Sequence, residues 1–273
     1  MGNKVCLITG ATSGLGKSIS IKLSKQDYNL ILISKSKAKL NSLSKILGKS
    51  NIQYVPVDLS NFKEIKKITK KIYNVDILIN NAGNFFFEKE KNNKSINKTI
   101  MINYFTPLYL IKKLILKNKF IKKKLIINIS SHTIMKSNIP ISKMHDLTNY
   151  NGWEIYKFSK LLSFLITNFL SKKYKNVKFI SFDPGRMKTN FGAGNNFFLR
   201  YLTKLYLKIL GKNPNIPAEK IVELIDAHKK NIKVKKNKKI INFNKMNANV
   251  NNLNLQKKLW AETNKVFEIN EKN

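Results

Sequence analysis

Short apolar runs alternate with longer stretches of helical periodicity along most of the chain. The runs are rich in β-branched residues and do not alternate with polar positions, which is typical of strands buried on both faces of a parallel sheet. The intervening segments are long enough for helical crossovers. The pattern therefore predicts an α/β fold with a doubly wound, mainly parallel sheet and helices on both faces. The expected strands lie at residues 5–8, 30–33, 53–57, 75–79, 125–129 and 177–182.

The pattern changes after residue 185. A continuous apolar face with basic residues spaced four apart predicts an amphipathic helical segment at about 190–213. We expect it to cover the substrate pocket, and a membrane-surface or partner-binding helix is the alternative. A charge run at 229–239 predicts a solvated loop before a last strand at 239–243, and a C-terminal helix is expected at about 253–268. We find no internal repeat, so residues 1–273 are predicted to form a single domain.

The net charge of +37 suggests an anionic partner, but the kind of base argues against nucleic acid. Arg186 and Arg200 are the only arginines, whereas phosphate and base-edge recognition favours the guanidinium fork. We therefore expect no nucleic-acid partner and interpret the lysines mainly as solvated surface. Because that interpretation leaves the scarcity of acids unexplained, an anionic partner stays open.

The titratable sulfur and imidazole groups give no sign of a metal site. Cys6 is the only cysteine, so no intrachain disulfide can form, and the three histidines are scattered. The first residues enter a strand-like stretch that does not resemble a signal peptide, and no apolar run approaches the ~18 residues that span a bilayer. We expect a cytoplasmic protein, with peripheral membrane contact as an alternative.

The first predicted strand leads directly into a glycine-rich turn and then into a helical pattern. Gly10 permits the tight turn, Gly14 lets the backbone approach a pyrophosphate, and Gly16 lets the helix lie close to the strand. The helix N-terminus then offers free N–H groups to phosphates. The turn predicts a dinucleotide site in a Rossmann fold, formed by Gly10, Thr12, Ser13, Gly14, Leu15 and Gly16.

Ser34, Lys35 and Ser36 stand at the end of the second predicted strand. An acid at this place would bind the ribose 2′-hydroxyl of NAD, whereas a cation and hydroxyls accommodate a 2′-phosphate. The sequence therefore predicts NADP(H) as the preferred cofactor, with NAD(H) as the alternative.

A tyrosine one helical turn before a lysine can act as a proton donor, because the ammonium can stabilise the phenolate. Ten tyrosines and 50 lysines in 273 residues give about two such pairs by chance, and three occur. They are Tyr109/Lys113, Tyr156/Lys160 and Tyr174/Lys178. The spacing alone does not choose among them.

Seven motifs in order along the chain resemble the short-chain dehydrogenase/reductase family, in the branch of retinol dehydrogenases, WW-domain oxidoreductases and protochlorophyllide reductases. The long interval from Ser131 to Tyr156 and the C-terminal 255–260 segment resemble that branch in particular. Asp183 departs from the His or Asn common at its position. The motifs are the nucleotide turn, Asp58-Leu59, residues 80–83, Asn103, residues 127–131, residues 156–160 and residues 184–189.

The resemblance implies a role for each matching residue. Asp58, followed by Leu59, would hold the adenine. The backbone of Asn81, Ala82 and Gly83 would line the nicotinamide ribose. Thr189 would contact the carboxamide, within a cofactor segment that includes Pro184, Gly185 and Met187. The resemblance also selects Tyr156/Lys160 as the chemical pair and leaves the other two as surface pairs.

The implied catalytic set is Asn103, Ser131, Tyr156 and Lys160. Tyr156 would donate a proton to a carbonyl oxygen, Lys160 would lower the pKa of Tyr156, Ser131 would bind the same oxygen, and Asn103 would hold a water. We therefore expect interconversion of a carbonyl and an alcohol. Because residues 134–151 and 187–212 are rich in Phe, Leu, Ile and Met, we expect an apolar substrate.

Two alternatives stay open. The same residues could reduce an activated C=C bond, or the chain could be a non-catalytic nucleotide-sensing or scaffold protein with a basic partner-binding surface. The family often pairs through the helices around Asn103 and Tyr156, which implies a homodimer or homotetramer.

Overall fold

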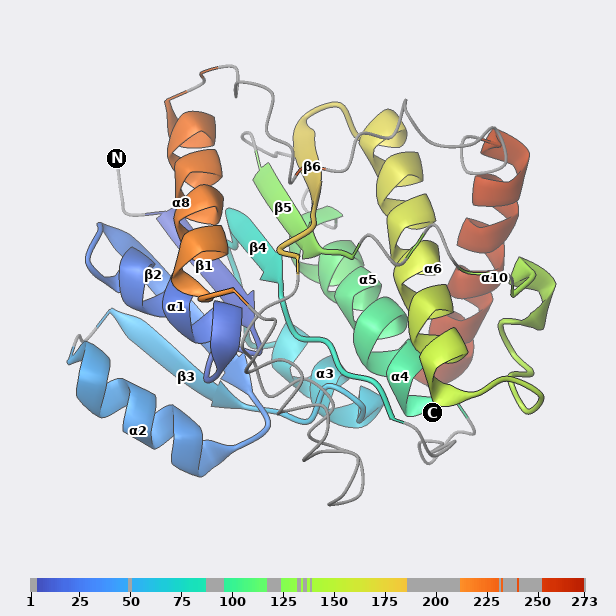
Figure 1. The fold of residues 1–273 in the computed structure, drawn as a ribbon, viewed down its shortest axis with the longest axis horizontal. Helices are drawn as coiled ribbons and strands as arrows, with labels where there is room; N and C mark the ends of the chain where they lie inside the picture. The colour runs from blue at the N-terminus through green and yellow to red at the C-terminus, as the bar shows by residue number, and fades with distance from the viewer. Residues whose placement is uncertain are drawn as a thin grey trace.

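Six parallel strands form the central sheet of the computed structural model (Figure 1). The structure describes residues 4–48, 51–86, 96–116, 124–131, 134, 137, 139–185, 212–230, 232, 240 and 252–272. The strands are β1 (Lys4–Thr9), β2 (Tyr28–Ser34), β3 (Ile52–Pro56), β4 (Ile77–Asn80), β5 (Lys124–Ile129) and β6 (Val177–Phe182). Their order in the sheet is β3-β2-β1-β4-β5-β6. The predicted α/β, doubly wound architecture is confirmed.

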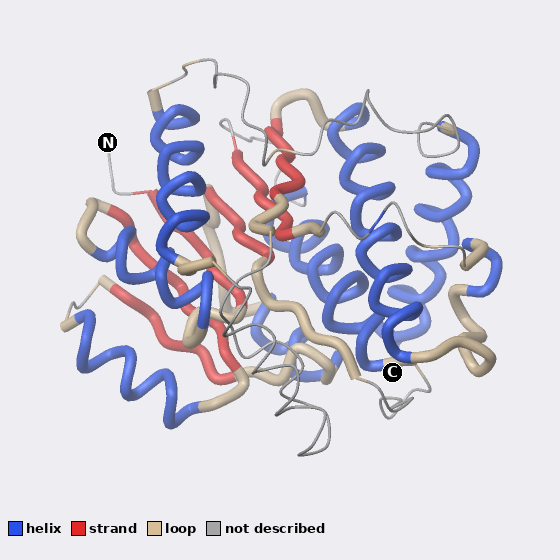
Figure 2. Tube along the Cα trace, viewed as in Figure 1, coloured by secondary structure: helices blue, strands red, loops and turns tan. Residues whose placement is uncertain are grey.

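Helices cover both faces of the sheet (Figure 2). One face is covered by α1 (Gly14–Ser24), α2 (Lys37–Leu47) and α8 (Asn215–Lys229). The other is covered by α3 (Phe62–Thr69), α4 (Lys98–Ile100), the π-helical turn η1 (Met101–Phe105), α5 (Thr106–Leu110), the π-helical turn η2 (Ile111–Leu116), α6 (Gly152–Lys173) and α10 (Leu253–Lys272). A short 3₁₀ turn, η4 (Ile141–Lys143), precedes α6.

Each face of the sheet has its own apolar core, because successive side chains of a strand point to opposite faces. In β1, Leu7 belongs to the core under α5 and α6, whereas Cys6 and Ile8 belong to the core under α1 and α8. All three side chains are fully buried. This two-sided burial explains why the strands appear in the sequence as continuous apolar runs.

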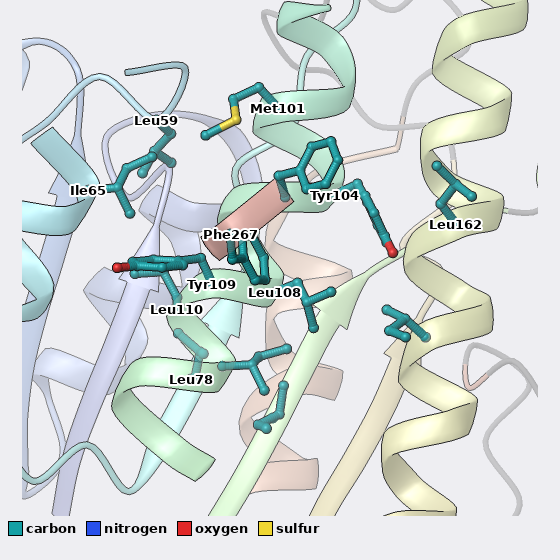
Figure 3. Close-up of a cluster of buried hydrophobic side chains, with 14 of the residues drawn as sticks. Leu59, Ile65, Leu78, Met101, Tyr104, Leu108, Tyr109, Leu110, Leu162 and Phe267 are labelled. Atoms are coloured by element: carbon teal, nitrogen blue, oxygen red, sulfur yellow. The ribbon is translucent and has the colours of Figure 1, made fainter. Parts of the chain in front are cut away.

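The C-terminal helix α10 closes the core on the α5 side (Figure 3). Phe267 is fully buried and packs against the ring of Tyr109, with ring centroids 5.3 Å apart. The hydroxyls of Tyr104 and Thr263 share a buried hydrogen bond of 2.6 Å. The helix runs four residues beyond its predicted end at 268 and ties the end of the chain to the domain.

One expectation is corrected, and one helix was not predicted. Tyr109, predicted to belong to a surface pair, is 2% exposed because its ring packs on Phe62 and Phe267. Helix α8 was not predicted, although Ala218, Ile221 and Ile225 follow helical spacing and are buried.

Two other predicted elements lie wholly or partly outside the described residues. The helical segment predicted at about 190–213 lies outside the described residues, except for positions 212 and 213. Of the strand predicted at 239–243, Ile240 is described, and it forms a single antiparallel bridge with Phe182. Within the described ranges, no helix has the length and apolar character needed to span a bilayer.

Candidate active site

The predicted site residues gather at the carboxyl ends of the strands, where β1 and β4 are neighbours although they are not consecutive in sequence. The chain winds in opposite directions from this point, and ligands of open α/β sheets bind in the crevice that results. Gly10 directly follows β1, residues 81–83 follow β4, and Ser130 and Ser131 follow β5. The fold therefore brings motifs from distant parts of the sequence to one edge of the sheet.

The glycine-rich turn has the conformation that a dinucleotide requires. Gly10 and Gly14 have positive φ angles of 67° and 50°, which residues with side chains rarely adopt. A Cβ atom on Gly16 would lie 2.2 Å from the Gly10 carbonyl oxygen, so only glycine fits where α1 approaches the turn. Ser13 precedes α1 without a side-chain cap bond, and the first turn of α1 carries no acid. The residues present fit a pyrophosphate at this helix N-terminus.

Thr9, at the end of β1, fixes the segment after β4. Its hydroxyl accepts hydrogen bonds from the amides of Asn81 (3.1 Å) and Ala82 (3.0 Å). The Asn81 side chain donates in turn to the carbonyl of Thr9 at 2.9 Å. These bonds hold residues 81 and 82 against the nucleotide turn. That the backbone of residues 81–83 lines the nicotinamide ribose stays a prediction.

The predicted adenine-side residues lie together after β2 and β3. The hydroxyls of Thr12 and Ser34 are 2.7 Å apart, and Ser36 caps α2 by accepting from the Lys39 amide at 3.2 Å. Lys35 and Asp58, assigned to opposite ends of the adenosine, form an ion pair of 2.7 Å with each other. Leu59, which follows Asp58, is buried in the core.

The Lys35–Asp58 ion pair changes the electrostatics at the end of β3. Burial alone would raise the pKa of Asp58, but the hydrogen bonds from Lys35 and from the hydroxyl and amide of Ser60 bring that pKa below its ordinary value. The carboxylate is therefore charged at neutral pH, and it offsets the charge of the lysine expected to meet a 2′-phosphate.

Tyr156 and Lys160 lie near the start of α6, a helix whose first turn is firmly defined. The Asn151 side chain accepts from the Glu154 amide at 3.0 Å, and Glu154 accepts from the Asn151 amide at 2.9 Å. This capping box fixes where α6 begins. Tyr156 and Lys160 follow within two turns and share one helix face, where they are 7% and 6% exposed.

The phenol of Tyr156 has the opposite pKa shift from the predicted one. Burial raises the pKa of Tyr156, a hydrogen bond with the Ser131 side chain lowers it, and the nearby Asp183 carboxylate raises it. The predicted net lowering of the Tyr156 pKa is therefore wrong for this structure, because burial is the largest effect on that pKa. Tyr156 stays a neutral phenol at neutral pH, which is the form that can donate a proton.

The ammonium of Lys160 is held at the end of β5. It donates a hydrogen bond to the carbonyl oxygen of Ile129 at 2.9 Å and lies 5.9 Å from the centre of the Tyr156 ring. Burial lowers the pKa of Lys160 to about 8, and Asp183 opposes that shift. A Cβ atom on Gly83 would lie 3.3 Å from this ammonium, so the glycine leaves room for it.

Asn103 uses its side chain to join the segment after β4 to α6. Its Oδ1 accepts from the Asn84 amide at 3.0 Å, and its Nδ2 donates to the Asn84 carbonyl and to Ser159 Oγ, both at 2.9 Å. Ser159 donates in turn to the carbonyl of Tyr156 at 2.7 Å. The amide expected to hold a water therefore works as a positioning group, and a water at Asn103 stays a prediction.

The segment after β6 completes the described part of the site. Pro184 is buried, and Gly185 has a φ of 74° and donates its amide to the Asp183 carboxylate at 2.8 Å. The predicted cofactor residues Met187 and Thr189 lie outside the described residues. In the described part of the chain, no cluster of three His, Cys, Asp or Glu side chains could hold a metal ion.

Sequence reasoning missed two aromatic residues beside the catalytic phenol. Trp153 stacks on Tyr156 with ring centroids 5.3 Å apart and planes at 19°. Phe85 approaches the same ring at 6.0 Å. The position of Trp153 three residues before Tyr156 places both on one helix face, and this spacing could have revealed the contact.

The family model for the short chain dehydrogenases matches residues 4–196, which include every motif described above. The chain belongs to the short-chain dehydrogenase family. It is accordingly a nicotinamide-dependent oxidoreductase that acts on alcohols or ketones.

Relatives place it further within that family. The chain is 30% identical over 220 residues to the 3-oxoacyl-[acyl-carrier-protein] reductase FabG of Buchnera aphidicola, covering 76% of this chain and 84% of that protein. It is 28% identical over 232 residues to human retinol dehydrogenase 13, covering 79% of this chain and 69% of that protein. The predicted retinol dehydrogenase-like branch is confirmed.

Solved structures agree on the fold. A short-chain dehydrogenase from Sphingobium yanoikuyae in complex with NADPH superimposes with a TM-score of 0.64 at 18% identity, covering 82% of this chain and 85% of that one. Other structural neighbours were solved with NADP+ or with NAD.

Proposed function

We propose that the protein interconverts an apolar ketone or aldehyde and its alcohol with NADP(H), using Tyr156 as the proton donor in the direction of reduction. The observation that carries this proposal is the hydrogen bond between the Ser131 side chain and Tyr156 at the end of β5. Two hydroxyls from different elements thereby converge on one point, where a carbonyl oxygen could accept from both.

Each residue of the site has its own role in the reaction. The bound nicotinamide supplies the hydride. Ser131 orients the carbonyl by a hydrogen bond, and Tyr156, kept neutral by burial, transfers its phenolic proton to the oxygen as negative charge develops there. The Lys160 ammonium, 5.9 Å from the phenol ring, stabilises the phenolate that remains. Asn103 and Ser159 keep the start of α6 in register with the segment after β4.

The preference for NADP(H) is supported by the residues after β2. Ser34, Lys35 and Ser36 include no acid, and the first turn of α2 carries none either. Lys35 is 78% exposed at its side chain, so it can turn from Asp58 towards a 2′-phosphate at little steric cost. The NADPH of the Sphingobium neighbour is consistent with this preference, whereas another neighbour was solved in complex with NAD.

The proposal extends to the setting of the reaction. We expect the enzyme to work in the cytoplasm or at the surface of a membrane, on a small-molecule substrate. The inferred pairing of two or four copies through the helices around Asn103 and Tyr156 stays a prediction. In this structure α10 already packs on both helices, through Tyr104 and Phe169.

A direct test follows the near-ultraviolet absorbance of NADPH while the protein is mixed with a panel of aliphatic and aromatic ketones, aldehydes and enones. We expect NADPH consumption with apolar carbonyl compounds and an alcohol as the product. A saturated ketone formed from an enone would point instead to C=C reduction. If no carbonyl compound were consumed at all, the proposal would be contradicted.

A further inference from the structure

Two aromatic side chains, Phe85 and Trp153, enclose the phenol of Tyr156, and we call them the aromatic wall. Trp153 lies almost parallel to the Tyr156 ring, at 5.3 Å and 19°. Phe85 meets Trp153 edge-on at 5.9 Å and 75°, and it meets Tyr156 at 6.0 Å and 56°. The three rings thus form one cluster in which each touches the other two.

The aromatic wall is held in place from both sides. Phe85 lies between two anchored neighbours, because Asn84 is bonded at both its amide and its carbonyl by Asn103, and the Phe86 amide donates to Thr99 Oγ1 at 3.4 Å. Trp153 stands in the first turn of α6, whose start is fixed by the capping box. Neither ring depends on a substrate for its position.

Exposure separates the members of the cluster. Tyr156 and Phe85 are 7% and 4% exposed, whereas Trp153 is 40% exposed. A tryptophan side chain used in a core or an interface ordinarily buries most of its surface. Trp153 therefore stays partly open to solvent although it stacks on the buried catalytic phenol.

We propose that Trp153 selects the substrate by stacking, so that the enzyme favours carbonyl compounds whose carbonyl is joined to a flat aromatic or conjugated group. This inference rests on the proposed function, since it places the carbonyl oxygen at Tyr156. A planar group can lie against the indole, whereas the saturated ring of the same size is thicker and loses that contact. Stacking of this kind amounts to about two- to tenfold in affinity.

The test compares benzaldehyde with cyclohexanecarbaldehyde, which differ in flatness but have rings of the same size. The quantity measured is the ratio of kcat/KM for the two aldehydes, because intrinsic reactivity cancels when variants are compared. Trp153→Leu keeps apolar bulk without an aromatic face, and Trp153→Phe keeps the aromatic face. Tyr73→Leu serves as the matched control, because this exposed ring precedes the amino end of β4, whereas the site lies at the carboxyl ends of the strands.

We expect the ratio to fall by about threefold or more in Trp153→Leu and to stay near the wild-type value in Trp153→Phe and Tyr73→Leu. A Trp153 that merely shields Tyr156 would lower both kcat/KM values equally, and an unchanged ratio in Trp153→Leu would overturn this inference while leaving the proposed function standing. Failure of the wild type to turn over either aldehyde or any other carbonyl would overturn both.

Discussion

The ammonium of Lys160 donates a hydrogen bond to the carbonyl oxygen of Ile129, 2.9 Å away, and so ties α6 to the end of β5. This bond holds a charged group in a place where it is 6% exposed. The arrangement serves the phenol of Tyr156, but it buries a cation at a cost in stability.

The burial of the Lys160 ammonium predicts how the stability of the fold depends on pH. The pKa of Lys160 is about 8 in the folded protein, against 10.5 for the unperturbed group, so the unfolded chain binds more protons between these pH values. Stability due to Lys160 therefore rises as pH rises from about 8 to 10.5, by on the order of 3 kcal/mol. Urea unfolding across this pH range gives the difference in free energy of unfolding between the wild type and Lys160→Met. The other lysines are the same in both proteins, so their titration does not affect this difference. A constant difference would show that Lys160 is not buried as a cation.

The Lys35–Asp58 ion pair predicts a change in cofactor preference. Lys35→Ala removes the cation expected to meet the 2′-phosphate and leaves the Asp58 carboxylate unpaired nearby, and both changes disfavour NADPH. We expect the ratio of kcat/KM for NADPH over NADH to fall about tenfold, as one charge-assisted hydrogen bond would give. Lys45→Ala, at the other end of α2, makes the same change in net charge and should leave the ratio unaltered. Equal ratios in both variants would exclude Lys35 from the site.

The hydrogen bonds of Asn103 predict that its substitution lowers the stability of the fold. Asn103→Ala removes the two hydrogen bonds that Asn103 makes with the half-buried backbone of Asn84, and each lost bond costs about 0.5–1.5 kcal/mol. Ser159→Ala removes one of the bonds of Asn103 and should cost less. Thermal unfolding gives the order of the two variants, and a larger loss in Ser159→Ala would contradict the role assigned to Asn103.

The sheet could be predicted because its strands are buried on both faces and therefore appear as uninterrupted apolar runs. Asn61 begins α3 for a similarly local reason, because its side chain accepts from the amides at positions 63 and 64. The burial of Tyr109 could not be predicted, because it comes from Phe267, which lies far away in the sequence. Spacing on one helix cannot show which helix will later cover it.

The candidate site likewise has features that the sequence predicts and features that it does not. Glycine positions and motif order located the nucleotide turn and selected Tyr156 from three tyrosines. The direction of the Tyr156 pKa shift depends on burial by surrounding elements, and the pairing of Lys35 with Asp58 depends on the register of β2 and β3. Both are tertiary properties that motif matching leaves undetermined.

Two residues of α10 that lie two positions apart should differ sharply in how much their substitution lowers stability. Phe267 is fully buried among Phe62, Phe105 and Tyr109, whereas Ile269 is 60% exposed. Phe267→Ala should lower the free energy of unfolding by about 3–5 kcal/mol, because it leaves a cavity in the core. Ile269→Ala should change it by less than about 0.5 kcal/mol. Urea unfolding of both variants measures this, and similar losses would contradict the placement of α10.

The central claim is that the Tyr156 hydroxyl donates the proton, and Tyr156→Phe tests it by removing one oxygen atom. Tyr174→Phe is the matched control, since it alters another tyrosine that precedes a lysine by four residues. The measurement is kcat/KM for NADPH-dependent reduction of the best carbonyl compound, together with the Kd for NADPH. We predict that Tyr156→Phe loses about 10²- to 10⁴-fold in kcat/KM while NADPH binding changes within a few-fold, and that Tyr174→Phe keeps wild-type activity. Retention of more than about a tenth of the activity by Tyr156→Phe would contradict the account, because general acid catalysis by that hydroxyl would then contribute less than tenfold.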